Sequence, residues 1–156
     1  MTTTTVTASS SVGESSSATT FASSPVITLA GRVLLTFIFI MAGLGHFAKP
    51  AIDAAAAAGV PLPGLAVPLS GVLAIVGGLS VLLGYHARIG AALLIAFLVP
   101  VTIMMHPFWA TPDPLMHQIH QVMLLKNVSI AGGVLLILAF GAGPLSVDAR
   151  RHARHS

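Results

Sequence analysis

Apolar residues fall into four long blocks along the chain, separated by shorter polar stretches. Each block is close to the ~20 residues that a helix needs to cross ~30 Å of hydrocarbon. None shows the two-residue alternation of a membrane β-strand, so a barrel is excluded. The pattern therefore predicts an all-α fold, a polytopic membrane protein with a four-transmembrane-helix bundle. The expected helices cover about residues 26–46, 65–84, 88–106 and 121–141.

The composition indicates the same class and excludes several functions. Hydrophobic residues make up 55% of the chain and charged residues 7%, against about 45–50% and about 25% in soluble proteins. Because there is no cysteine, disulfides, iron–sulfur clusters and thiolate metal sites are excluded. The four acidic residues all lie outside the apolar blocks, which argues against a proton-driven pump. The net charge of +3 forms no basic stripe, so the expected partner is the lipid bilayer and not nucleic acid.

The chain divides into a central membrane domain and two polar tails. Residues 1–24 hold fifteen Ser or Thr and no Lys or Arg; without the features of a signal peptide, they are expected to form a retained, disordered tail. Residues 25–145 form the four-helix domain, and residues 146–156 form a basic tail. An even number of helices places both tails on one side, together with most of the arginines. The positive-inside rule then predicts that both termini are cytoplasmic.

Two features inside the apolar blocks bear on packing. Glycines recur there, notably as Gly-Gly pairs in the second and fourth blocks. Small residues let helix backbones approach in lipid, so we interpret them as close helix packing, with a flat ligand wedged against the pairs as the alternative. Arg32 lies near the start of the first helix and is expected to snorkel to the membrane surface.

The segment 104–127, MMHPFWATPDPLMHQIHQVMLLKN, is unusually polar for a stretch between two apolar blocks. It joins the third and fourth helices on the side opposite the termini, where the loop 46–64 also lies. We expect a polar, ligand-binding pocket at that membrane face, and we assign no catalytic residue. The candidate residues are His46, His106, Trp109, His117, His120, Lys126 and Asn127.

The histidines of this set leave two interpretations open. His117 and His120 are three residues apart, so on a helix they share a face. Together with His106 they are weak candidates for the ligands of a metal ion or haem. Histidine is also common at membrane interfaces without any ligand. The segment 51–64 is interpreted as a short interfacial helix that roofs the cluster, or as a plain connection.

The other candidates carry similar alternatives. Lys126 lies inside the start of the fourth apolar block, where it either holds a phosphate, a carboxylate or a quinone oxygen, or snorkels to the surface. Asn127 is expected to make an interhelical hydrogen bond. Trp109 is typical of an interfacial anchor.

Four stretches carry a resemblance to a known family: GRVLLTFIFIMAGLGHFAKP, GVLAIVGGLSVLLGYHARIGA, VPVTIMMHPFWATPDPLMHQIHQVMLLKNVSIAGGVLLI and GAGPLSVDAR, within about residues 26–150. Together they resemble the DoxX family of small bacterial membrane proteins. In a motif similar to HxFW followed by KN, the matching residues are His106, Phe108, Trp109, Lys126 and Asn127. One departure is Ala74, where many relatives carry an acidic residue.

The resemblance implies a four-helix protein of the bacterial inner membrane that is linked to redox complexes. On that basis we predict a quinone-linked redox subunit or accessory of an oxidoreductase complex, with quinone as cofactor and other redox subunits as partners. The alternative is a non-enzymatic membrane scaffold or assembly partner. A small-solute transporter is a weaker alternative, and a homo-oligomer is kept open because a dimer offers room for a path.

Overall fold

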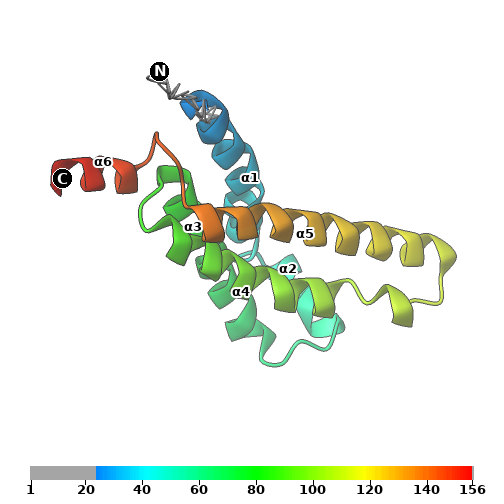
Figure 1. Ribbon diagram of the computed structural model, residues 1–156. Coiled ribbons are helices and arrows are strands. Elements are labelled where there is room, and N and C mark those ends of the chain that lie inside the picture. The colour runs from blue at the N-terminus through cyan, green and yellow to red at the C-terminus, as the bar shows by residue number, and fades with distance from the viewer. Residues whose placement is uncertain (1–23, 156) are drawn as a thin grey trace, which may run out of the picture.

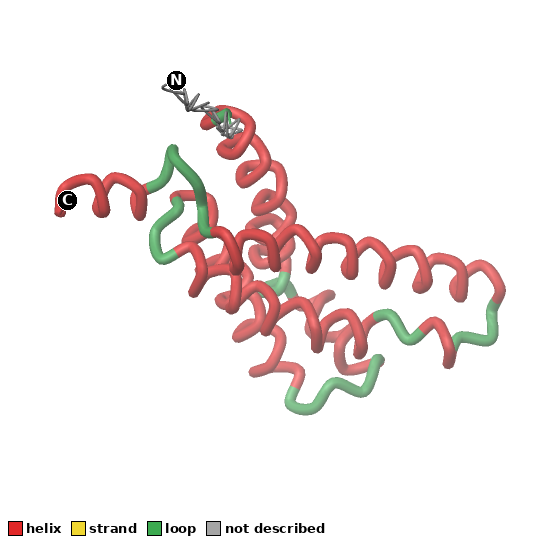
Figure 2. The backbone as a smooth tube through the Cα atoms, in the orientation of Figure 1, coloured by secondary structure: helices red, strands yellow, loops and turns green. Residues whose placement is uncertain are grey.

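The computed structural model describes residues 24–155, so the tail expected at residues 1–24 lies almost wholly outside the described part. That part contains only helices and loops (Figure 2), which confirms the all-α prediction. Four helices are long and apolar enough to cross a membrane: α1 (Pro25–Gly45), α3 (Pro63–Leu83), α4 (Ala87–Met105) and α5 (Pro114–Phe140). The shorter elements are α2 (Lys49–Ala57), the 3-10 turn η1 (Phe108–Ala110) and α6 (Val147–His155).

Local sequence explains where the long helices begin and end. Proline stands in the first turn of α1, α3 and α5, where its missing N–H is not needed. α3 is terminated by Gly84, the residue that follows it, whose φ of +65° is left-handed. α5 begins at Pro114, seven residues before the expected start at 121, because the Asp113 carboxylate accepts a hydrogen bond of 2.8 Å from the Met116 backbone N–H and caps the helix. Its first turns are polar, so a search for apolar blocks misses them.

The long helices pack in chain order: α1 against α3, α3 against α4, and α4 against α5. Figure 1 shows α4 and α5 running side by side while α1 crosses at a steep angle. α1 and α5 have little contact; one place is near Leu35 and Gly133. α2 packs against α3, and α6 lies at the opposite end of the molecule (Figure 1). Consequently, only Asn127 and Val134 of α5 are buried.

Glycines bring the helix axes together, as the sequence predicts. A Cβ atom on Gly43 of α1 would lie 2.9 Å from the carbonyl oxygen of Gly71 in α3, and one on Gly77 would lie 2.9 Å from that of Gly90 in α4. No side chain fits in such contacts, so the backbones themselves touch. Gly132, in contrast, has nothing within 4 Å of its Cβ position, and the close-packing interpretation does not extend to it.

Arg32 does not snorkel as expected: its side chain is only 2% exposed. The guanidinium Nη2 donates to the Leu145 carbonyl, in the loop between α5 and α6. It also lies against Gly84 of the α3–α4 turn. The expectation was wrong because that loop and turn fold over the end of α1 and supply a carbonyl acceptor inside the protein.

Candidate functional site

His46 is the residue that follows α1, and its ring lies in a junction between α1 and α3. Ring atom Nδ1 is 2.8 Å from the Ser70 hydroxyl oxygen. That hydroxyl donates its single proton to the Val67 carbonyl at 2.7 Å, so Nδ1–H of His46 is the donor to Ser70. Nε2 then keeps its lone pair. Burial lowers the pKa of His46, although the Val67 carbonyl partly raises it, so the ring is mostly neutral at pH 7.

A cavity of about 230 Å³ lies beside this pair, between α2, the first half of α3 and the last turns of α4. Its lining is largely apolar, and His46 and Ser70 are the only side chains in it that carry a hydrogen-bonding group. The other lining residues are Ala51, Ala54, Ala55, Val60, Ala66, Val67, Pro100, Val101, Met104 and Met105. The alanines of α2 leave the room, because a larger side chain at those positions would fill it.

The other three histidine candidates lie beyond the end of α4. The rings of His106 and His120 are 5.7 Å apart between centroids, and the Nδ1 atoms of both are buried without a hydrogen-bond partner. His117 stands perpendicular to Phe108 at 5.5 Å. Among residues 24–155 no three His, Cys, Asp or Glu are grouped so that they could hold a metal ion. The metal or haem alternative therefore gains no support.

The remaining candidates are Asn127, Lys126 and Trp109, and each lies in different surroundings. Asn127 is buried, and its Nδ2 donates to the Thr102 hydroxyl at 3.1 Å, which is the interhelical hydrogen bond that the sequence predicts. Lys126 is exposed on α5 and lies 3.4 Å from the Met123 sulfur. Trp109 is 58% exposed and meets Phe108 edge-on at 5.2 Å.

The seven predicted residues thus do not meet in one pocket. His46 belongs to the cavity under α2, the histidines of segment 106–120 form a separate aromatic group, and Lys126 and Asn127 point in different directions along α5. Of the residues that line the actual cavity, only His46 was a predicted site residue, although segment 51–64 was interpreted as a helix that roofs the cluster or as a plain connection. A signal for the other residues was the run AIDAAAAAGV, in which small residues repeat next to His46.

Comparison with known proteins gives consistent matches. The sequence model of the SURF4 family matches residues 6–153. The chain is 29% identical to inner membrane protein YphA of Escherichia coli over 83% of its length and 93% of that protein. It is 30% identical to inner membrane protein YqjF of the same organism, over 77% of this chain and 88% of that protein. A Surfeit locus protein 4 homolog of Schizosaccharomyces pombe is 29% identical over 79% of this chain and 37% of that protein. No solved structure matches.

These matches overturn the resemblance to the DoxX family, because the family model that matches almost the whole chain is a different one. The stretches that carried the resemblance consist mostly of Gly, Ala, Leu, Ile and Val, which any small helical membrane protein needs for close packing. Asn127, which belongs to the motif similar to HxFW followed by KN, forms the bond to Thr102 between α4 and α5. Nothing in the matches supports a quinone or a redox complex, so the prediction of a quinone-linked subunit loses its basis.

Proposed function

Because the chain belongs to the SURF4 family and is a multi-pass inner membrane protein, we propose that it acts without catalysis, by binding the apolar chain of a membrane lipid in the cavity beneath α2. The observation that carries this proposal is the largely apolar cavity of about 230 Å³ with the His46–Ser70 pair in its wall. Both termini are proposed to be cytoplasmic, which places this cavity at the outer face of the membrane.

The size and lining of the cavity favour an alkyl chain over water. An apolar cavity of about 150 Å³ in a soluble protein stays dry and takes up benzene. This one is larger, at about 230 Å³, and its walls are alanine, valine, proline and methionine. The atoms that line such a cavity make fewer dispersion contacts than atoms in a packed interior. A chain that enters from the bilayer recovers them, and the flexible side chains of Met104 and Met105 adapt to it.

The polar pair gives the cavity an orientation. His46 presents an unprotonated Nε2, as argued above from its bond to Ser70, and this atom is the acceptor for a hydroxyl or amide of a lipid headgroup. The chain would lie among the alanines of α2, while the headgroup would stay near His46. This arrangement supports a lipid whose headgroup carries a hydrogen-bond donor, such as the ammonium group of phosphatidylethanolamine.

The test uses a phosphatidylethanolamine with a photoactivatable diazirine in its acyl chain, in nanodiscs that contain the full-length protein. Adducts at Met104 and Met105 are counted by mass spectrometry. Ala54→Leu places a larger side chain in the cavity, and Ala57→Leu, on the same helix but outside the lining, is the matched control. We expect Ala54→Leu to reduce these adducts severalfold and Ala57→Leu to leave them unchanged. Equal labelling of the wild type and both variants would remove the cavity as a lipid site.

A second function, as a membrane assembly partner, is favoured by one observation on α5. Lys126, Ser129 and Gly132 are exposed at spacings that place them on one side of that helix. A charged side chain on a membrane-spanning helix faces protein or water by default, because lipid does not solvate it. We propose a second copy of the chain against this surface, which is the homo-oligomer that sequence analysis kept open.

The chain has no cysteine, so single-cysteine variants in native membranes test this contact cleanly. Ser129→Cys is expected to form a disulfide-linked dimer on mild oxidation. Val76→Cys, half-exposed on α3, is the control and should stay monomeric. A dimer at neither position, or an equal yield at both, contradicts the α5 contact and leaves the lipid proposal untouched.

A further inference from the structure

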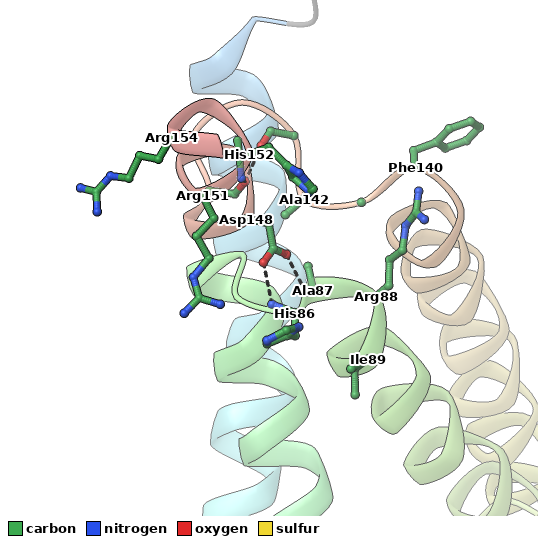
Figure 3. Close-up of a pocket in the computed structure, with 14 residues that line it drawn as sticks. His86, Ala87, Arg88, Ile89, Phe140, Ala142, Asp148, Arg151, His152 and Arg154 are labelled. Carbon is green, nitrogen blue, oxygen red and sulfur yellow. Dashed lines mark hydrogen bonds between the residues drawn. The ribbon is translucent and has the colours of Figure 1, made fainter. Parts of the chain in front are cut away.

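A second cavity lies at the opposite end of the helices, between the start of α4, the end of α5 and α6 (Figure 3). Its volume is about 870 Å³. Five basic side chains line it, and one acidic side chain does: His86, Arg88, Arg151, His152 and Arg154, with Asp148. The arginines among them served above only to predict the topology.

The single carboxylate does not neutralise the arginines. Asp148 turns towards the α4 start (Figure 3), where one oxygen accepts from the His86 backbone N–H at 2.9 Å and the other from that of Ala87 at 3.0 Å. No arginine that lines the cavity forms an ion pair with Asp148, and the Lys49–Asp53 ion pair lies elsewhere. Even with the histidines left out of the count, three arginines against one aspartate give the cavity a formal charge of +2. This excess favours an anionic occupant.

The contacts of two arginines leave donors for such an occupant. Arg88 uses one guanidinium nitrogen on the Ala139 carbonyl, at 3.1 Å. Arg151 lies over the Tyr85 ring, 4.7 Å from its centre, a stacking contact that does not use the in-plane N–H groups. Planar guanidinium groups bind phosphate oxygens through such paired N–H donors.

The position of the cavity indicates where the anion comes from. α4 begins and α5 ends beside it, so it lies at the level where hydrocarbon gives way to headgroups. Two of its lining residues are apolar and exposed, Ile89 at 61% and Phe140 at 80%. In Figure 3 the Phe140 ring points away from the arginines, out from the end of α5. The site therefore combines a basic interior with an apolar rim that acyl chains can cover.

We propose that this cavity binds the phosphate group of an anionic phospholipid, with the acyl chains lying against Ile89 and Phe140. Arg88, on α4, would bind the phosphate beside the apolar rim. Arg151, on α6, lies on the other side of Asp148 (Figure 3) and would add to the positive potential of the cavity. This site is independent of the apolar cavity beneath α2, which lies at the other end of the helices.

The test compares lipid retention by native mass spectrometry, with full-length protein purified from vesicles of equal phosphatidylglycerol and phosphatidylcholine. We expect one phosphatidylglycerol to be retained in preference to phosphatidylcholine. Arg88→Gln and Arg151→Gln should each weaken retention about fivefold, the effect of one basic residue near an anionic surface. Arg150→Gln is the matched control: it removes the same charge from the same helix, at a position that does not line the cavity.

Three results would overturn the proposal: equal retention by Arg88→Gln, Arg151→Gln and Arg150→Gln, no preference for phosphatidylglycerol, or binding of millimolar inorganic phosphate by a protein that retains no phosphatidylglycerol. The last would show that the site takes free phosphate and not lipid. Because Arg151→Gln also loses its contact with Tyr85, the variant is checked by amide exchange of α6. Arg88→Gln leaves α6 unaltered and keeps the test decisive if Arg151→Gln detaches that helix.

Discussion

The two ends of the helix bundle use polar side chains in opposite ways. At the end that carries α6, which we name the arginine end, side chains bind the backbone of distant segments. Arg32 reaches Leu145 over 113 positions of the chain, and Asp148 reaches the backbone of His86 over 62. Helix ends leave backbone groups without partners, and here those groups are satisfied across the fold.

At the other end, which we name the histidine end, such ties are few. His106 and His120 meet ring to ring, 5.7 Å apart between centroids. The polar group of His46 bonds one hydroxyl at the edge of a cavity. The difference indicates that the arginine end fixes the helices relative to one another through side-chain bonds to the backbone, whereas the histidine end, roofed by the alanine-rich α2, is held by fewer such bonds.

The largest expected effect that tests this contrast is a loss of stability in Gly84→Ala, at the arginine end. Gly84 has φ +65°, and a Cβ there would overlap Ser146, Arg32 and Ala142. We expect a loss of roughly 3 kcal/mol in the free energy of unfolding, from the left-handed backbone plus the overpacking. Thermal unfolding in detergent measures it. Gly132→Ala, with open space around it, is the control, and a similar loss in both variants would contradict the special role of this turn.

The next effect is the release of α6 by Asp148→Asn. An amide can accept only through its single oxygen, so one of the two bonds to the α4 start is lost, along with the charge. We expect the docking of α6 to weaken by about 1–2 kcal/mol, seen as faster amide exchange over residues 147–155. Asp113→Asn, which alters a cap at the histidine end, should leave α6 unaffected. Unchanged exchange in Asp148→Asn would show that α6 is held by other contacts.

The same contact predicts a dependence on pH. Burial raises the pKa of Asp148, but the N–H groups of Ala87 and His86 and the charges of His86 and Arg151 outweigh it, so the pKa lies below its ordinary value of 3.8. A carboxylate with a lowered folded-state pKa contributes its full stability above the unfolded pKa and loses it as the pH falls below. Docking of α6 should therefore be constant from pH 7 to about pH 4 and weaken below that. Exchange rates, corrected for the intrinsic effect of pH, measure this.

The contrast also shows how much the sequence could predict. Apolar blocks predict the membrane helices well, because lipid imposes one length on all of them: α1, α3 and α4 begin and end within two residues of their expected positions. The bond from Asn127 was predictable too, since a buried amide in lipid needs a partner. The hydrogen bond of Arg32 could not be predicted, because its acceptor lies 113 residues away in a loop. The cavity under α2 depends on the angle at which that helix lies, and the periodicity of the sequence does not predict this angle.

A smaller effect is expected between the two ends, where Asn127 of α5 donates to Thr102 of α4. Interhelical hydrogen bonds of this kind contribute about 0.6 kcal/mol on average. A double-mutant cycle of Asn127→Ala and Thr102→Val, followed by unfolding in detergent, should give a coupling energy near that value. A coupling of zero would mean that the two side chains are independent and that α4 and α5 are held by packing alone.

The smallest effect is expected at the histidine end itself, for the ion pair of Lys49 and Asp53. Its N–O distance is short, 2.6 Å, but the two side chains are 82% and 60% exposed. Exposed pairs four residues apart on a helix contribute about 0.3–0.5 kcal/mol, and salt screens them further. Lys49→Gln should therefore change the unfolding free energy hardly at all, and less at high salt. A loss as large as that of Asp148→Asn would show that α2 is tied down as firmly as α6, and the contrast between the two ends would no longer hold.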